Sequence, residues 1–174
     1  MKELAGNEPH PTRCVPVLAV SPIDEDAVVL ECIANDSGWT EDAGCKWRLM
    51  ASRTLAPAVT ILRQSHEPIP GVVCERDLLP GSWVDLLEQL TLLPDPPILV
   101  VTSRLADGRL WAEALNRGAY DVLAKPFDGT EVIRTLNSAW MHWCDHRRPW
   151  SPTQAPHALP RCANWTQTFP ARHL

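Results

Sequence analysis

Several chemically active side chains follow apolar runs in this sequence, at points where a buried strand would reach the surface. The groups that follow the runs are Ser21-Pro22, Glu75-Arg76-Asp77, Thr102-Ser103 and Lys125-Pro126. Lys125 is the most unusual, because it places a positive charge directly after the apolar residues 122–124. A crevice holding Ser21, Ser103 and Lys125 would suit a small α/β enzyme or a ligand-binding module. The chain has no Gly-rich phosphate loop, G-x-S-x-G elbow or H-E-x-x-H motif to define such an activity further.

The apolar runs predict the strands of a parallel sheet. They lack polar alternation, as strands covered on both faces do, and they span 15–20, 71–74, 98–102 and 121–124. Residues 46–52 alternate apolar and polar side chains, which is typical of a half-exposed edge strand. Segments with helical spacing lie between the strands, at 24–34, 54–65, 83–93 and 109–118. This order predicts a doubly wound α/β fold, with a five-stranded parallel sheet, helices on both faces and ligands at the carboxyl ends of the strands.

The pattern fits one domain with a segment at each end. Asp128 and Glu131 have the spacing of a capping box, and they predict a last helix that runs to about Trp143. From residue 144 onward the chain is rich in proline and polar residues and too short to form a second core. We therefore predict a flexible segment over 1–14, a domain over 15–143 and a disordered, Pro-rich tail over 144–174.

Composition restricts the classes of partner and the cellular compartment that we expect for this protein. The net charge is −5, with 45% hydrophobic and 21% charged residues, which argues against a nucleic acid or a membrane surface as the main partner. The six cysteines are scattered without a C-x-x-C pair, and the first residues contain no apolar leader segment. No apolar run approaches the roughly 20 residues that cross a bilayer. These features predict a cytoplasmic protein with reduced thiols.

The stretch ILVVTSRLADGRLWAEALNRGAYDVLAKPFD, residues 98–128, resembles without a gap the second half of a bacterial response-regulator receiver domain. The resemblance extends over about residues 15–143 and implies the flavodoxin-like receiver fold. In that family an aspartate after the third strand accepts a phosphoryl group from a histidine kinase, and two acidic residues after the first strand hold Mg²⁺. A hydroxyl after the fourth strand and a lysine after the fifth bind the phosphoryl oxygens. Such transfer depends mainly on positioning and charge neutralisation, so the resemblance makes Lys125 the cation on the phosphate side.

Several family positions carry other residues in this chain. The acidic pair is replaced by Ser21 and Pro22, which offer no carboxylate to a cation that prefers oxygen ligands, so we expect neither Mg²⁺ nor another cofactor. Counting back from Lys125 and its neighbour Pro126 places Ser103 at the hydroxyl position, with Thr102 beside it. The same count puts Val122 where the family has its switch aromatic, with Tyr120 two residues earlier.

The phosphoacceptor position depends on the register of VVCERDLLPGSWVDLL. Aligning the following helix without a gap places Glu75 there, and this register is preferred. Aligning on Pro80-Gly81 places Arg76 there instead, and Asp77 is the nearest aspartate. One hypothesis for Glu75 is that its longer side chain pairs with Lys125 and holds the domain in its signalling shape; the alternative is an ordinary ion pair at the end of the sheet.

The preferred functional interpretation is a degenerate, stand-alone receiver in phosphorelay signalling that is not an enzyme and acts through protein–protein contact. Its expected partner is a kinase or an output protein, and homodimer formation is left open. One alternative is a receiver phosphorylated on Asp77, with an irregular metal site built from Asp24 or Asp26. Another is the small enzyme or ligand-binding module considered above.

Three further segments have weaker functional signals. Asp24, Glu25 and Asp26 are interpreted as charges that favour the start of a helix. The helical face around Trp111 fits either the core or, by the resemblance, the face that receivers commonly use for dimers and partners. The residues HWCDH, 142–146, contain possible zinc ligands, but their spacing is not that of a usual zinc site.

Overall fold

The computed structural model describes residues 13–35 and 45–147, and within them strands and helices alternate along the chain. The elements are β1 (Arg13–Val20), α1 (Asp24–Asn35), β2 (Cys45–Ser52), α2 (Leu55–Gln64), β3 (Gly71–Glu75), α3 (Trp83–Thr91), β4 (Ile98–Ser103), α4 (Gly108–Arg117), β5 (Asp121–Ala124) and α5 (Gly129–His146). The strands form one sheet in the order β2-β1-β3-β4-β5, and every neighbouring pair is parallel. The predicted α/β fold with its five-stranded parallel sheet is therefore confirmed.

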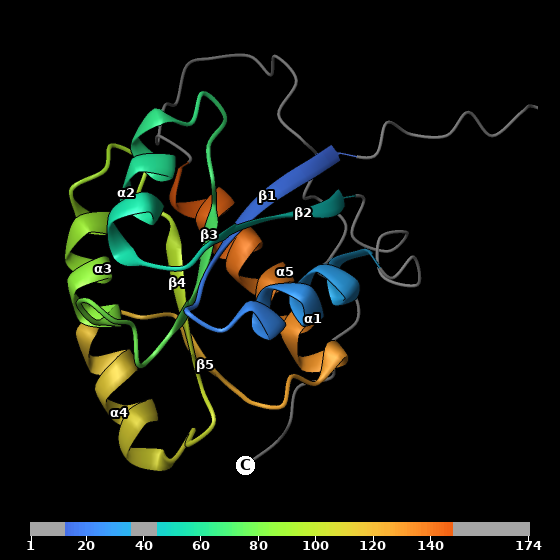
Figure 1. Ribbon diagram of the computed structural model, residues 1–174. Helices are drawn as coiled ribbons and strands as arrows, with labels where there is room; N and C mark the ends of the chain where they lie inside the picture. Colours follow the sequence, from blue (N-terminus) through green and yellow to red (C-terminus); the bar gives the residue numbers. More distant parts are fainter. Residues whose placement is uncertain (1–12, 36–44, 148–174) are drawn as a thin grey trace, which may run out of the picture.

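Helices cover both faces of the sheet, with α1 and α5 on one face and α2, α3 and α4 on the other (Figure 1). Successive side chains of β1 point to alternate faces, so Leu18 and Val20 belong to one core cluster, while Val17 and Ala19 belong to the other. All four are buried, because a parallel strand inside this arrangement is covered on both sides. This double covering explains the continuous apolar runs.

Polar residues at the helix ends fix where the connecting loops begin. The side chains of Ser82, Asp107 and Asp128 each accept a hydrogen bond from a backbone N–H in the first turn of α3, α4 and α5. Gly118 ends α4 with a φ of 104°, a left-handed conformation that favours glycine. The helix start predicted from Asp128 is thus present.

The ordered region is slightly longer at both ends than the predicted domain of 15–143. β1 begins at Arg13, because it pairs in register with β2, and α5 continues to His146. At the predicted helix end, the ring of Trp143 is buried and its Nε1 donates a hydrogen bond to the carbonyl of Pro96 at 3.2 Å. The guanidinium of Arg147 lies 4.3 Å from that ring. The rest of the two predicted end segments, 1–12 and 148–174, lies outside the described residues.

The strands bring their carboxyl ends to one edge of the sheet. β3 pairs with β4 so that Glu75 lies opposite Thr102, and β4 pairs with β5 so that Ser103 lies opposite Ala124. Lys125 follows directly after β5, and its backbone N–H donates to the carbonyl of Ser103 at 3.0 Å. Four of the residues singled out from the sequence therefore lie along this edge. None of the described helices is long and apolar enough to span a membrane.

Candidate functional site

Lys125 is the centre of a buried cluster of charges at the carboxyl edge of the sheet. Its Nζ atom contacts a carboxylate oxygen of Glu75, at the end of β3, and one of Asp26, in the first turn of α1. The three side chains are only 5%, 7% and 11% exposed, respectively. A single ammonium thus bridges two carboxylates that are 49 residues apart in the sequence.

The pairing of β3 and β4 positions Glu75. Beyond the last paired residues, the backbone N–H of Arg76 donates to the carbonyl of Thr102 at 2.8 Å, which keeps the two strand ends aligned. The hydroxyl of Thr102 donates to Oε2 of Glu75 at 3.4 Å, and the backbone N–H of Asp77 donates to Oε1 at 3.4 Å. Both carboxylate oxygens of Glu75 therefore have partners within the chain.

Asp26 is positioned by Ser21 and by the phase of α1. The hydroxyl of Ser21 donates to Oδ2 of Asp26 and accepts a hydrogen bond from the backbone N–H of Ile23 at 3.2 Å. Asp26, Leu30 and Ala34 are the buried residues of α1, and they are spaced four residues apart. The carboxylate therefore lies on the helix face that packs against the sheet.

All three acidic residues at 24–26 lie in the first turn of α1, as their interpretation as helix-start charges predicts, but they differ in exposure. Asp24 and Glu25 are exposed, and Asp24 pairs with Arg53 at 2.7 Å. Asp26 is the exception, because it is buried and bound to Lys125. Its spacing to Leu30 and Ala34 is the signal in the sequence that would have indicated its burial.

The electrostatics of the cluster favour mutual pairing over binding of another anion. One positive and two negative groups give a formal charge of −1. Cys74, which precedes Glu75, has its pKa raised by burial and by the negative charge of Glu75. Among the described residues, every buried side-chain nitrogen and oxygen has a hydrogen-bond partner. The cluster is internally satisfied.

The other predicted site residues lie around this cluster with different contacts. Ser103 Oγ accepts a hydrogen bond from the backbone N–H of Leu105 at 3.1 Å. Arg76 and Asp77 form an exposed pair at 3.7 Å, with the Asp77 side chain 78% exposed, so neither joins Lys125. The carbonyl of Pro22 accepts a hydrogen bond from Arg53.

The two residues considered for the aromatic switch have separate surroundings. Val122 is buried in the core on the side of α2, α3 and α4. Tyr120 packs on the opposite side, where its ring centroid lies 5.3 Å from that of His142. The two residues thus belong to opposite faces of the sheet.

An open hollow of about 440 Å³ lies beside the charge cluster. Its lining residues are Glu25, Asp26, Val29, Arg104, Lys125, Pro126 and Phe127. The ring centroid of Phe127 is 5.6 Å from Nζ of Lys125, so an aromatic side chain covers one side of the ammonium. The hollow brings together Lys125 and Pro126 from the sequence prediction, but Ser21 and Ser103 are not among its lining residues.

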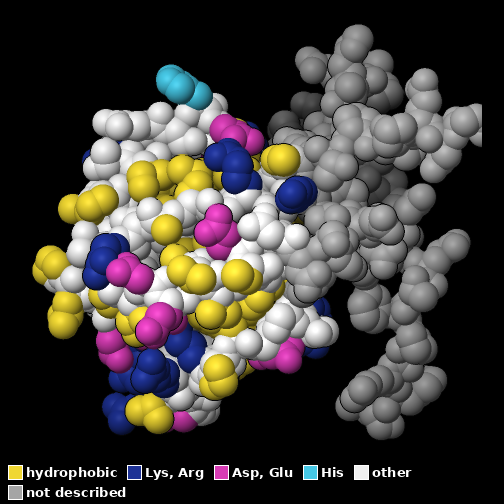
Figure 2. Space-filling model, turned by 45° about the vertical axis from the view of Figure 1, so that its right-hand side comes forward, with side chains coloured by type: hydrophobic (Ala, Val, Ile, Leu, Met, Phe, Trp, Pro, Cys, Tyr) yellow, Lys and Arg dark blue, Asp and Glu magenta, His cyan; other side chains and the backbone are white. Residues whose placement is uncertain are grey.

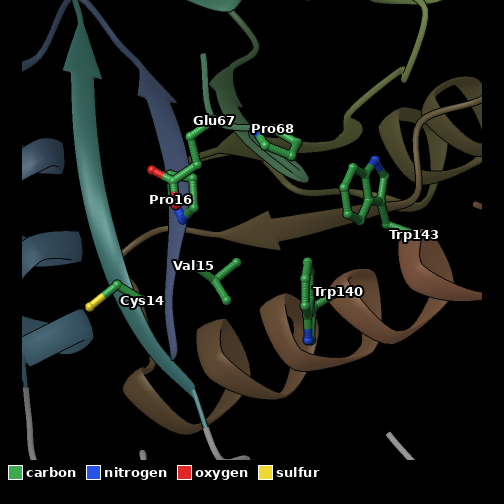
Figure 3. Close-up of a pocket in the computed structure, with 7 residues that line it drawn as sticks. All are labelled: Cys14, Val15, Pro16, Glu67, Pro68, Trp140 and Trp143. Carbon is green, nitrogen blue, oxygen red and sulfur yellow. The ribbon is translucent and has the colours of Figure 1, made fainter. Parts of the chain in front are cut away.

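A second cavity, at the amino ends of the strands, is too small for a ligand. Its volume is about 20 Å³, enough for about one water molecule. Figure 3 shows the side chains of Trp140 and Trp143 on α5 beside this cavity, with Val15 on β1. Of these two cavities, only the hollow beside Lys125 has room for a ligand larger than water.

The carboxylates near Lys125 have few free oxygens for a metal ion. Mg²⁺ requires near-octahedral coordination by oxygen. Asp26 and Glu75 are both bound to Lys125, and Asp24 is bound to Arg53. In residues 13–35 and 45–147 no group of three or more His, Cys, Asp or Glu side chains could hold a metal ion, so residues 142–146 do not form a zinc site with three or more such ligands.

Comparison with known proteins gives a consistent structural result. No protein-family model matches the sequence, and no curated protein matches it. A putative response regulator from Chloroflexus aurantiacus J-10-fl has a TM-score of 0.63 at 17% identity, over 74% of this chain and 99% of its own. The signal receiver domain of an HD domain-containing protein from Pseudomonas fluorescens Pf-5 has a TM-score of 0.64 at 22% identity, over 81% of this chain and 97% of its own. The solution structure of the beryllofluoride-activated NtrC4 receiver domain dimer has a TM-score of 0.61 at 20% identity, over 74% of this chain and 98% of its own. The chain therefore has the fold of response-regulator receiver domains.

Proposed function

We propose that this chain is a degenerate receiver in two-component signalling, which acts by protein–protein contact and does not undergo Mg²⁺-dependent aspartate phosphorylation. The observation that carries the proposal is the contact of Lys125 with both Asp26 and Glu75. In a working receiver the equivalent lysine would face a phosphoryl group. Here two carboxylates of the chain itself take its charge.

The charge of the cluster disfavours an incoming phosphoryl group. Asp26, Glu75 and Lys125 together carry −1, and a phosphoryl group adds about −1.5 to −2 near neutral pH. Two like unit charges 4 Å apart repel by about 4 kcal/mol at an effective dielectric constant of 20. Without a further cation, binding the anion would require Lys125 to leave at least one of its carboxylates.

Mg²⁺ is not part of the proposal, because the donors do not fit it. Ser21 supplies a hydroxyl where the family has a carboxylate, and that hydroxyl donates to Asp26. Asp26 and Glu75 each already give one carboxylate oxygen to the ammonium of Lys125, which competes with a metal ion for these groups. A buried, paired cluster of this kind favours a fixed arrangement over a switch driven by metal and phosphate.

Glu75 has the geometry expected of a permanent substitute for a phosphorylated aspartate. Its carboxylate is one methylene farther from the backbone than that of aspartate, and it reaches Lys125 and the hydroxyl of Thr102. We infer that Glu75 holds β4, β5 and the loop between β4 and α4 in one conformation. The partner would then recognise this conformation without a phosphorylation step.

In this proposal, the partner binds the surface formed by α4 and the loop before it. Trp111 and Leu115 are one helical turn apart on α4, with 36% and 46% of their surfaces exposed, and Leu105 in the loop is 72% exposed. Leu105 also connects the face to the site, since its N–H donates to Ser103. Figure 2 shows one face of the molecule, on which hydrophobic side chains are mixed with charged ones. A second signalling protein is the proposed partner.

Intact-mass spectrometry after incubation with acetyl phosphate, with and without Mg²⁺, tests the absence of phosphorylation. We expect no added phosphoryl mass under conditions that label a conventional receiver. The Asp77→Asn variant is the matched control for the alternative acceptor, because Asp77 is exposed and makes no contact with Lys125. A Mg²⁺-dependent gain of one phosphoryl mass that disappears in Asp77→Asn would overturn the proposal.

Amide chemical shifts of Glu75→Gln test the role of Glu75 separately. The substitution keeps the length of the side chain and removes its charge, so the pair with Lys125 is weakened without creating a cavity. We expect shift changes that extend through residues 103–105 into α4. Changes confined to the immediate neighbours of Glu75 would mean an ordinary ion pair and would contradict the signalling role.

A further inference from the structure

Two histidines in the last turns of α5 face one another outside the proposed site. His142 and His146 are four residues apart on the helix, both are exposed, and their ring centroids are 4.0 Å apart with an angle of 46° between the planes. Side chains at this spacing share one face of a helix. The two imidazoles are therefore already close together without any change of backbone.

One hydrogen bond sets the proton position on His146. Its Nδ1 atom lies 2.8 Å from the carbonyl oxygen of His142. A carbonyl oxygen only accepts, so Nδ1 must carry the proton, and in the neutral ring Nε2 keeps its lone pair. Histidines that bind metals commonly donate their other ring N–H to a carbonyl or carboxylate in this way.

His142 has two aromatic neighbours, Tyr120 and His146. Its ring lies 5.3 Å from that of Tyr120 and 4.0 Å from that of His146. Its pKa is lowered by burial and by the neighbouring His146. Two imidazoles that already lie close together need little reorganisation to bind a cation.

The separation of the rings suits a shared metal ion. Nitrogen ligands lie about 2.0–2.1 Å from Zn²⁺, so two of them in a tetrahedral site are roughly 3.3 Å apart. Centroids 4.0 Å apart allow ring nitrogens to reach that separation by side-chain rotation. Cys144 is half-buried and lies two residues along the helix, where side chains point away from this face.

We propose that His142 and His146 chelate a divalent transition-metal ion, with water completing its coordination. Imidazole ligands suit Zn²⁺, Ni²⁺ and Cu²⁺, and the general order of affinity places Cu²⁺ above the other two. The site is separate from the cluster around Lys125, and it does not depend on the proposed signalling function. A bound cation would link the last two turns of α5 and lie near the carbonyl end of the helix, where positive charge is favoured.

NMR of the histidine side chains in the full chain tests the proposal with Ni²⁺ as the probe. Substoichiometric Ni²⁺ is paramagnetic, so it should broaden the ring signals of His142 and His146 together, before those of the four other histidines. Simultaneous broadening of all six, or broadening of another histidine first, would overturn the proposal.

Calorimetry with ZnCl₂ and NiCl₂ gives a second measurement on matched variants. We expect His142→Ala and His146→Ala each to weaken the tightest binding event by at least about tenfold, because a chelate loses one of its two ligands. His66→Ala is the control, since His66 is another exposed histidine outside the pair, and Cys144→Ser tests the neighbouring thiol. A loss in either control equal to that in His142→Ala would refute the assignment. All four positions are exposed or half-buried, and circular dichroism would verify that each variant is folded.

Discussion

Replacing Lys125 with methionine is the most direct test of the buried charge cluster. The substitution keeps an unbranched side chain but leaves Asp26 and Glu75, 11% and 7% exposed, without their shared cation. Removing one partner of a buried ion pair typically costs 3–5 kcal/mol, because the remaining charge stays desolvated. Because Asp26 and Glu75 both remain buried without their cation, we expect the free energy of unfolding to fall by about 3–5 kcal/mol. A domain of this size has about 5–15 kcal/mol in total, so the variant would be close to its stability limit.

Urea unfolding followed by circular dichroism and tryptophan fluorescence measures this loss. Arg48→Met is the matched control, because the Arg48–Glu67 pair is about half exposed on both sides and should contribute no more than about 1 kcal/mol. Adding Asp26→Asn and Glu75→Gln to Lys125→Met removes the unpaired charges and should recover part of the stability. If Lys125→Met costs no more than Arg48→Met, the cluster is effectively solvated and our argument from burial is wrong.

Three other predictions concern separate parts of the molecule. Gly118→Ala should cost about 1 kcal/mol in urea unfolding, because alanine is strained at a φ of 104°, whereas Gly108→Ala, in open space at the start of α4, should be neutral or stabilising. Iodoacetamide should modify the exposed Cys14 in the native protein but Cys74 only after unfolding, since Cys74 is buried and its pKa is raised by burial. In metal-free buffer, the NMR titration of His142 should have its midpoint below 6.5, because its folded pKa is lowered. The small contribution of neutral His142 to the stability of the fold should therefore be present above pH 6.5 and lost as the pH falls through the pKa of the folded state. A titration midpoint above 6.5 would contradict this prediction.

Much of the fold is predictable from the sequence because burial on both faces leaves a simple pattern. A parallel strand between two helix layers must be apolar throughout, so the runs ending before Glu75 and Lys125 mark both the strands and the edge at which they end. The positions of Thr102 and Ser103 at that edge follow from the same pattern. The element ends are less predictable, since no local pattern encodes the pairing with β2 that begins at Arg13 in β1, or the last turn of α5 beyond Trp143.

Asp26 could not be assigned from residue type alone. An acidic residue in the first turn of a helix is ordinary, because it interacts favourably with the helix dipole whichever way it points. What separates Asp26 from Asp24 is the phase of α1, in which Leu30 and Ala34 lie on the face directed at the sheet. The partner on the other side, Lys125, is 99 residues away, so only the three-dimensional arrangement identifies the pair.

The contacts of Lys125 explain why a positive charge follows a buried strand. They are compatible with two roles of the charge cluster, one purely structural and one in signalling. A lysine whose side chain is 5% exposed needs anionic partners, and Asp26 and Glu75 meet that need even if the cluster only stabilises the domain. A purely structural cluster predicts that Glu75→Gln lowers stability and leaves α4 unchanged. A cluster that fixes a signalling conformation predicts, in addition, a change at α4, transmitted from Ser103 through its hydrogen bond to Leu105. Ser103→Ala separates the two further, because it removes this connection and leaves the charges of Lys125 and Glu75 in place. If Glu75→Gln alters partner binding and Ser103→Ala does not, the transmission does not run through this hydrogen bond.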